Sequence, residues 1–304
     1  MRHSLNRHIL GEKTDRYQFV RYNEYYGVTR VCRLIHVSKS GYYAWKSRKP
    51  SKRSLENEKL IFEIRVFHEK SKKNAGSPKI FKALRKAGIE CGKNRVVRLM
   101  RETGIRCKYA KKYKATTNSK HDYPVAENIL KQHFVAVMPN EIWVGDITYV
   151  WTNEGWLYVS IVIDLYARKV VGLAMSEHID SDLANAALKQ AIDRRRPGPG
   201  LIYHTDRGST YAADTHQEIV RENQLTMSMS RKGDPFDNAV SESTIGFYKR
   251  ELVFDEKFET RTKAKVKTFE YFEVTFNRER LHSTNGYKTP EEFEAEYFEK
   301  KQRN

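Results

Sequence analysis

The chain of 304 residues has few cysteines, no repeat of fixed period and no long apolar run. Its 3 cysteines are Cys32, Cys91 and Cys107, and no C-x-x-C pair occurs among them. This argues against a disulfide framework and a cysteine zinc site, and favours a reducing intracellular compartment. No apolar stretch reaches the ~18 residues that a membrane-spanning helix needs. We therefore expect no membrane span and no signal peptide.

Acidic residues are scarce in the first part of the chain. Residues 1–120 contain 32 Lys and Arg against 9 Asp and Glu, a net charge of +23. Residues 121–304 contain 24 Lys and Arg against 29 Asp and Glu, a net charge of −5. A strongly basic part beside a mildly acidic one indicates that the first part holds a polyanion. Nucleic acid fits better than a membrane surface, because the basic part lacks a strong apolar anchor face.

Residues 1–52 are predicted to form a helix-turn-helix-like DNA-binding segment. A first helix passes through Val31 and Leu34, and a tight turn follows near Val37. Ser38 is a candidate N-cap for a second helix, which Pro50 stops. Lys39, at the start of that helix, is a candidate contact for the DNA backbone. Any small helical bundle has similar spacing, so the pattern alone is a weak signal.

Residues 53–106 are predicted to form a second helix-turn-helix-like domain of three helices. In its middle helix, Ser77 is the expected N-cap, Pro78 the first helical residue and Gly88 the stop. The last helix spaces basic residues three apart, at Arg95, Arg98 and Arg101. This basic face is expected to contact the DNA backbone, with a solvated helix surface as the alternative. Residues 107–138 are expected to be a basic linker.

Residues 139–304 are predicted to be an α/β domain with a mixed five-stranded sheet and flanking helices. Three β-rich runs separated by short breaks fit an antiparallel meander, and a helix beginning after the N-cap Ser181 follows them. A continuous apolar run, "LIYHTD", is expected to be a buried fourth strand, and "TMSMS" a fifth. The order β-β-β-α-β-α-β-α is typical of a sheet with helices packed on it.

Three carboxylates in this domain are candidates for chemistry. Asp146 lies inside an apolar strand, where an unpaired charge is costly. Asp206 ends the buried fourth strand, and ligands of open α/β sheets bind near the carboxyl ends of strands. Glu242 lies in the first turns of the next helix. Such an all-oxygen set suits Mg²⁺ or Mn²⁺, and two ions ~4 Å apart would support phosphoryl transfer. The alternative is a set of surface acids with capping roles.

The helix that carries Glu242 is expected to begin near Asp237. Asp234 belongs to the turn before it, and Asp237 is the expected N-cap. Asn238, Glu242 and Lys249 share one helical stripe, while another stripe packs on the sheet. Lys249 is therefore expected to meet a DNA phosphate, with a solvated surface lysine as the alternative.

The same residues carry a resemblance to a known family. Asp206 and Glu242 are separated by 35 residues, which is similar to the D, D-35-E pattern of retroviral integrases and related bacterial transposases. Six segments of the chain resemble, more specifically, the insertion-sequence transposases that are encoded by a second reading frame. The segments are "VSKSGYYAWKSR", "WVGDITYVWTNEGWLYVSIVIDLYARKVVG", "HTDRGSTY", "SMSRKGDPFDNAVSES", "YKRE" and "FNRERLHSTNGYKTPEEF". The chain departs from the family at Phe236, usually Trp, and at Thr210, usually Gln.

The resemblance implies a ribonuclease-H-like integrase catalytic core preceded by small all-α units. It implies Asp146, Asp206 and Glu242 as catalytic metal ligands, with two Mg²⁺ or Mn²⁺ ions. His204 and Arg207 flank Asp206, and a phosphate contact by Arg207 is weighed equally against a surface role. Asn277, Arg280 and His282 are weaker candidates for DNA contact.

The activity that the resemblance implies is cleavage and strand transfer at insertion-sequence ends. Its partners would be double-stranded DNA of the terminal inverted repeats and the target, further copies of the chain, and an upstream first-frame protein. The expected location is the bacterial cytoplasm, in association with the nucleoid. The alternative is a non-catalytic DNA-binding accessory or regulatory subunit of a transposition complex. Whether the chain acts alone or fused to its upstream partner stays open at this point.

Overall fold

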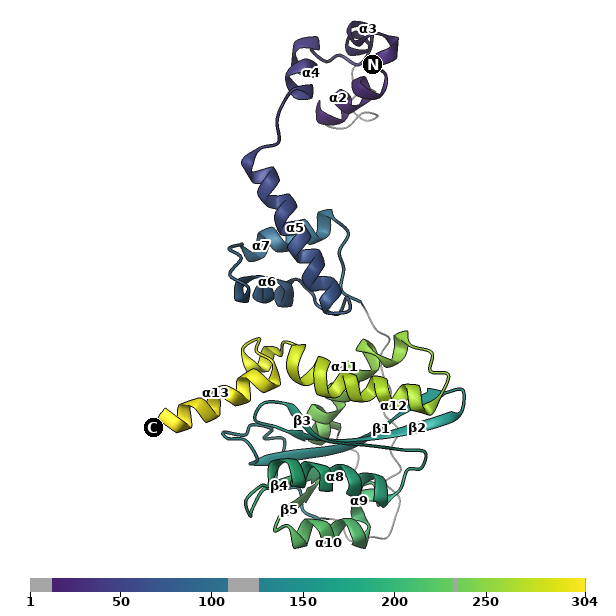
Figure 1. Ribbon diagram of the computed structural model, residues 1–304, viewed down its shortest axis with the longest axis vertical. Helices are drawn as coiled ribbons and strands as arrows, with labels where there is room; N and C mark the ends of the chain where they lie inside the picture. Colours follow the sequence, from purple (N-terminus) through teal and green to yellow (C-terminus); the bar gives the residue numbers. More distant parts are fainter. Residues whose placement is uncertain (1–12, 109–125, 232–234, 304) are drawn as a thin grey trace. The chain divides into compact units, whose positions relative to one another are not determined.

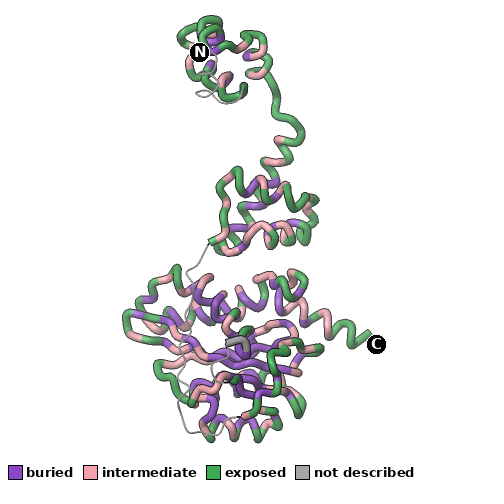
Figure 2. The backbone as a smooth tube through the Cα atoms, turned by 180° about the vertical axis from the view of Figure 1, so that it is seen from behind, coloured by how far each residue is buried: buried purple, intermediate pink, exposed green. Residues whose placement is uncertain are grey.

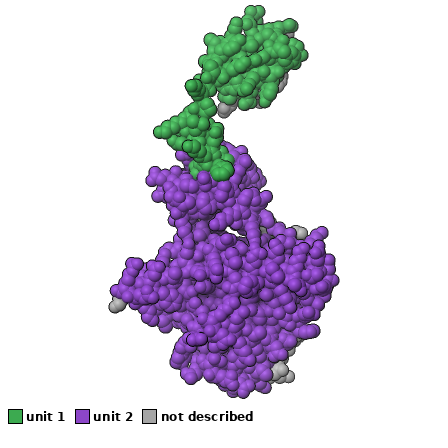
Figure 3. Space-filling view, viewed as in Figure 1, with its two compact units in different colours: residues 1–62 green, residues 63–304 purple. Residues whose placement is uncertain are grey.

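The computed structural model describes residues 13–108, 126–231 and 235–303. The chain divides into two compact units, residues 1–62 and 63–304 (Figure 3). The division falls inside a helix, Lys52–Lys70. Most of the predicted linker, residues 109–125, lies outside the described residues. Within the described ranges, no helix is long and apolar enough to cross a membrane.

The first unit contains helices α2 (Lys13–Tyr22), α3 (Val28–Leu34) and α4 (Lys39–Lys46) and the short helix η1 (Glu24–Tyr26). Its small core includes Tyr17, Val20 and Tyr42. The Ser38 Oγ accepts a hydrogen bond from the Gly41 amide at 3.2 Å, which confirms the predicted N-cap. The helices α3 and α4 are thus joined by a four-residue turn, the spacing of a helix-turn-helix.

Helices α5 (Lys52–Lys70), α6 (Ser77–Lys86) and α7 (Lys93–Glu102) follow. The predicted cap of α6 was wrong by one position. Gly76 occupies the N-cap, so Ser77 is already helical and Pro78 is the second helical residue. The fixed φ of proline suits any position in the first turn, and it therefore does not specify where the helix begins. Gly88, with a φ of +77°, follows the end of α6 as expected, and Gly104, with a φ of +70°, follows the end of α7.

The second unit contains a five-stranded sheet in the order β3-β2-β1-β4-β5. The strands are β1 (Ile142–Thr152), β2 (Gly155–Asp164), β3 (Lys169–Ser176), β4 (Ile202–Thr205) and β5 (Thr226–Met229). Strands β1 to β3 form the predicted antiparallel meander, whereas β4 runs parallel to both β1 and β5. The predicted mixed sheet with flanking helices is therefore confirmed.

Helices cover both faces of the sheet (Figure 1). On one face lie α8 (Ser181–Arg195), α9 (Ser209–Ala212) and α10 (Asp214–Glu222). On the other lie α11 (Ala239–Glu251), α12 (Arg261–Glu270) and its π-helical continuation η4 (Tyr271–Glu279), followed by α13 (Pro290–Arg303). Each face has its own apolar core, and the buried residues concentrate along the sheet and the inner sides of these helices (Figure 2).

The predicted cap of α8 was also wrong by one residue. Asp180 has extended backbone angles, and its Oδ1 accepts a hydrogen bond from the Leu183 amide at 3.0 Å. The helix therefore begins at Ser181 rather than after it. Both side chains are good cap formers, and only the backbone decides which of two neighbours takes the position.

Candidate active site

The sheet register brings Asp146 and Asp206 together. In the parallel pair β1 and β4, Val144 lies opposite His204. Continuing this register by two residues sets position 146 of β1 opposite position 206, just past the end of β4. Neighbouring strands lie ~4.8 Å apart, so the two carboxylates occupy one small region. Asp146 therefore lies within the long strand β1, at the point where the parallel neighbour β4 ends and Asp206 follows.

Asp146 is 7% exposed and is held by two hydrogen bonds. Its Oδ1 accepts from the Ile147 amide at 2.8 Å, and its Oδ2 accepts from the Asn238 Nδ2 at 3.2 Å. Burial raises the pKa of Asp146 well above its usual value, and the charges of Asp206 and Glu242 raise it further. The negative charges of Asp206 and Glu242 are therefore close enough to Asp146 to repel its charged form.

Asp206 is fixed by the turn that follows β4. Its Oδ1 accepts a hydrogen bond from the Gly208 amide at 2.8 Å. A Cβ at position 208 would lie 3.0 Å from this oxygen, so a glycine allows the close approach. The carboxylate is therefore oriented by the backbone just before α9.

Glu242 enters from the first turn of α11. Its side chain is partly exposed, and it makes no hydrogen bond with any residue of the described chain. Burial raises the pKa of Glu242. Because it acts on Asp146 through its charge, Glu242 faces the same region as the two strand aspartates.

The donor chemistry of these residues fits a hard divalent cation. All three are carboxylates, the ligands that Mg²⁺ and Mn²⁺ prefer, and their mutual repulsion is what such a cation would relieve. Within the described ranges, however, no three His, Cys, Asp or Glu side chains are gathered closely enough to ligate one ion as they stand.

A buried tyrosine near the site, Tyr203, had not been expected. Burial raises the pKa of Tyr203, as do the nearby charges of Asp206 and Asp146. A Cβ at position 145 would lie 2.4 Å from the Tyr203 hydroxyl, so Gly145 makes room for this ring beside β1.

Asp237 does not cap α11 as the sequence predicted. Asn238 takes the N-cap position, and Asp237 belongs to the preceding short helix η2 (Pro235–Asn238). The buried Asp237 Oδ2 accepts hydrogen bonds from the Asn128 Nδ2, the Arg231 amide and the Arg231 Nε at 2.8, 2.8 and 3.0 Å. The carboxylate thus fastens the start of α11, while the predicted turn residue Asp234 lies outside the described residues.

His204 joins the same network from β4. Its Nδ1 lies 2.9 Å from the Ser228 Oγ, and its Nε2 lies 2.9 Å from the Asp237 carbonyl oxygen. Burial lowers the pKa of His204, which favours the neutral ring. The network connects β4, β5 and the residues before Glu242, and we infer that it positions α11.

We expect Asp237→Asn to lower the free energy of unfolding by about 2 kcal/mol, because the buried carboxylate loses the charge that accepts from Arg231 and Asn128. Hydrogen bonds from Arg231 lower the pKa of Asp237 to about 2. A lowered folded pKa stabilises the protein above the unfolded pKa of ~3.9, and this stability is lost as the pH falls through the folded value. The gap between parent and variant in urea melts should therefore shrink from pH 5 towards pH 2. A constant gap would contradict this account.

The structure does not place Lys249 on the outer side of α11. The side chain is 4% exposed, and its Nζ donates to the Tyr149 carbonyl oxygen and lies 4.4 Å from the Tyr149 ring centroid. This carbonyl belongs to the part of β1 that extends beyond its pairing with β4. Burial lowers the pKa of Lys249 to about 8. A phosphate contact would require the side chain to leave this position.

Lys249→Met is expected to lower the free energy of unfolding by about 1 to 3 kcal/mol, because the Tyr149 carbonyl loses its donor. DNA affinity should change by less than about twofold. Thermal melts and anisotropy with end DNA would measure the two effects. If the variant is as stable as the parent but binds end DNA several-fold more weakly, Lys249 contacts DNA, as the sequence predicted.

The remaining predicted DNA contacts lie at varied positions. Arg207 donates from its Nε to the Ser230 carbonyl oxygen at 2.5 Å and lines a cavity of about 740 Å³ with Lys131 and Arg231. Lys39 is exposed at the first position of α4. Arg98 forms an ion pair with Glu102 at 2.9 Å within α7.

Arg95, one turn before Arg98 on α7, is partly exposed. Asn277, a weaker candidate, is buried and exchanges two 2.9 Å hydrogen bonds with the backbone of Val170 in β3. Its side chain therefore joins η4 to the sheet.

The fold has neighbours among solved structures. The HTLV-2 integrase catalytic core domain in complex with magnesium matches 52% of this chain and 99% of that chain, at 19% identity and a TM-score of 0.42. The simian T-cell lymphotropic virus intasome in complex with PP2A regulatory subunit B56 gamma covers 76% of this chain and 74% of that chain, at 16% identity and a TM-score of 0.45.

Sequence comparisons are more specific. Residues 136–235 and 223–290 match two families described as Integrase core domain, and residues 55–113 match the HTH-like domain family. The IS600 uncharacterized 31 kDa protein of Shigella sonnei is 41% identical, covering 88% of this chain and 98% of the relative. The transposase for IS904 of Lactococcus lactis is 42% identical, covering 81% of this chain and 98% of the relative.

The transposase InsF for IS3A of Escherichia coli is 36% identical, covering 88% of this chain and 94% of the relative. The match thus extends over nearly the full length of each of these relatives, and it includes both the helical part and the sheet. The chain therefore belongs to the family of insertion-sequence transposases that have an HTH-like domain and an integrase catalytic core.

Proposed function

We propose that Asp146, Asp206 and Glu242 are the catalytic residues of this transposase and hold two divalent cations, Mg²⁺ or Mn²⁺. The observation that supports the proposal is the placement of three carboxylates, from two adjacent parallel strands and one helix, in one region where the charges of Asp206 and Glu242 raise the pKa of Asp146. Bound at this site, the cations would lower the pKa of an attacking water and offset the developing phosphate charge. Membership in the transposase family supports the same assignment.

The residues of the chain then have distinct roles. Asn238 and the Ile147 amide orient the two oxygens of Asp146, and the Gly208 amide orients Asp206. Glu242, without a hydrogen bond within the described chain, is available to move towards the pair. The His204 and Asp237 network fixes the start of the helix that carries it.

The proposed reaction has two steps of the same chemistry. Water first forms a bond to phosphorus at the end of the element, and the 3′ oxygen leaves with a proton as a free hydroxyl. That hydroxyl then bonds to the phosphorus of a second phosphodiester and releases its 3′ oxygen. Neither step needs a covalent bond between protein and DNA, so no nucleophilic side chain is required.

The partners follow from the same proposal. The chain acts on double-stranded DNA at terminal inverted repeats and at a target, in the bacterial cytoplasm at the nucleoid. The HTH-like match and the excess of basic residues before position 120 support DNA binding. Two DNA ends must meet for joining, which favours self-association, and an upstream first-frame protein is the further proposed partner.

A strand-transfer assay tests this function. The full chain, alone and with its upstream partner, is incubated with labelled end DNA and Mg²⁺, and cleaved and joined products are measured. We expect both products with Mg²⁺ and neither after chelation with EDTA. End binding without cleavage under every condition would instead support a non-catalytic accessory subunit.

A further inference from the structure

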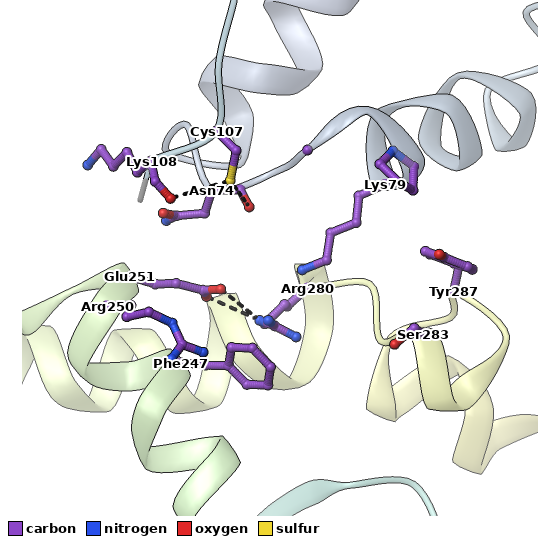
Figure 4. Close-up of a pocket in the computed structure, with 12 residues that line it drawn as sticks. Asn74, Lys79, Cys107, Lys108, Phe247, Arg250, Glu251, Arg280, Ser283 and Tyr287 are labelled. Carbon is purple, nitrogen blue, oxygen red and sulfur yellow. Dashed lines mark hydrogen bonds and ion pairs between the residues drawn. The ribbon is translucent and has the colours of Figure 1, made fainter. Parts of the chain in front are cut away.

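A cavity of about 360 Å³ lies where α6 approaches the end of α11, inside the second unit (Figure 4). We call it the α6–α11 pocket. Lys79 of α6 extends into it from one side, and Arg250 and Glu251 of α11 lie on the other with Arg280. The pocket is thus built from segments about 170 residues apart in sequence, and none of its residues belongs to the acidic site.

The one carboxylate of the pocket is already neutralised. The Nε of Arg280 donates to both oxygens of Glu251 at 3.1 and 3.2 Å, and the Tyr271 hydroxyl donates to Oε2 at 2.9 Å. The Arg280 guanidinium also stacks 3.7 Å from the Phe247 ring centroid. The side chains of Arg280 and Glu251 are 8% and 10% exposed, so this buried ion pair forms a fixed wall of the pocket.

Two further cations remain in excess. Neither the Lys79 amine nor the Arg250 guanidinium has a hydrogen bond or ion pair with any residue in the described ranges. Burial lowers the pKa of Lys79 to about 8, with Arg280 contributing through its like charge. Two unpaired cations beside a closed Arg–Glu pair give the pocket a net positive charge, which an anion would relieve.

Helix α6 adds to this charge. Its N-cap is Gly76, which offers no side-chain acceptor, and both Gly76 and Pro78 line the pocket. Pro78 has no amide hydrogen and the Ile80 amide donates to the Gly76 carbonyl oxygen, so the helix contributes mainly through its N-terminus, which carries about half a positive charge. Backbone and side chains together therefore form a site of the kind that binds phosphate groups.

The position of Arg250 relates the pocket to the acidic site. Glu242, Gly246 and Arg250 follow one another at steps of four residues along α11, so they lie near one face. A Cβ at position 246 would lie 3.2 Å from the Arg250 Nη1, which shows that the guanidinium folds back over Gly246. Eight residues at ~1.5 Å each set Arg250 about 12 Å from Glu242 along the helix axis.

We propose that the α6–α11 pocket binds a phosphate of the DNA backbone, about three to four nucleotides from the scissile bond at ~3.4 Å of helix axis per nucleotide. This rests on the proposed function, because it assumes that DNA occupies the acidic site. Arg250, rather than the buried Lys249, is then the residue of α11 that holds the strand. The contact also fixes the HTH-like helices and the catalytic core on the same DNA.

Two substitutions test the proposal, Lys79→Ala and Arg250→Ala. Lys189→Ala serves as the matched control, because Lys189 is an exposed lysine on α8, which packs on the opposite face of the sheet. Affinity for end DNA is measured by anisotropy across a range of salt concentrations. Each pocket variant should bind several-fold more weakly and reduce the log–log salt slope by about 0.9, whereas the control should match the parent. Thermal melts should show no loss of stability for Lys79→Ala, since an unpaired cation is removed.

A second measurement identifies the phosphate. A set of end DNAs is made in which one phosphate, at a different position in each, is replaced by a neutral methylphosphonate. The parent should bind one of these DNAs more weakly than unmodified end DNA. The Lys79→Ala, Arg250→Ala double variant should bind that DNA and unmodified end DNA with the same affinity. If the parent binds end DNA but both pocket variants bind with its affinity and salt slope, the pocket is not a phosphate site. If the parent itself fails to bind or cleave end DNA, the proposed function fails instead.

Discussion

Replacing Asp146 with asparagine is expected to lower the rate of end cleavage by at least about a thousandfold, given the share of catalysis that metals supply in phosphoryl transfer. Asp206→Asn and Glu242→Gln should have effects of the same size. Each change removes one negative charge from the acidic site while keeping the shape of the side chain. Affinity for end DNA should stay within about twofold of the parent, because the basic residues proposed to hold the DNA phosphates are unchanged in these variants.

Asp193→Asn provides the matched control for these acid variants. Asp193 is an exposed carboxylate on α8, on the face of the sheet away from α11, and its loss should leave cleavage unchanged. Cleavage is measured in single turnover with Mg²⁺, so that product release does not mask the chemical step. More than about a thousandth of the parent rate in one of the three variants would remove that residue from the metal site.

Deleting residues 1–50 is expected to lower the affinity for end DNA by about a hundredfold or more at moderate salt. These residues contain 11 Lys and Arg against 3 Asp and Glu, and they include the exposed Lys39 at the start of α4. Each phosphate contact that is lost should reduce the log–log salt slope by about 0.9. Binding isotherms of the full chain and of residues 51–304 would measure both quantities.

The truncated chain should keep its fold, since residues 63–304 form a compact unit of their own. Circular dichroism and thermal melts would check this before binding is compared. Lys39→Ala in the full chain should show a smaller loss in the same direction. Equal salt slopes for the full and truncated chains would mean that the basic first unit does not neutralise DNA phosphates.

The sheet and two of the acids were predictable because local pattern and topology agree. Asp146 stands out as a charge within an apolar strand, and Asp206 follows a continuous buried run. Helix starts were less predictable, since polar residues occur side by side. Asp180 and Ser181 compete as caps, as do Asp237 and Asn238, and the choice depends on backbone angles that tertiary contacts set.

The rotation of α11 could not be derived from its own sequence. The sequence put Lys249 on a different stripe from the one expected to pack on the sheet, whereas the structure buries Lys249 and packs it against Tyr149. Lys249 donates to the Tyr149 carbonyl oxygen in a part of β1 beyond its pairing with β4, and this partner lies 100 residues from Lys249 in sequence.

The α6–α11 pocket could not be predicted from the sequence either, because it depends on contacts between distant segments. Lys79 and Arg250 meet only in the folded chain, and neither belongs to a motif that resembles a known site. Their charges are visible in the sequence, but their lack of partners is a property of the packing.

Calorimetric titration of Mn²⁺ into the full chain with bound end DNA tests the central claim most directly. The parent is expected to bind up to two ions per acidic site, and the Asp146→Asn, Asp206→Asn double variant is expected to bind neither, with its affinity for DNA unchanged. Equal Mn²⁺ binding by the parent and the double variant would show that these carboxylates are not the metal ligands.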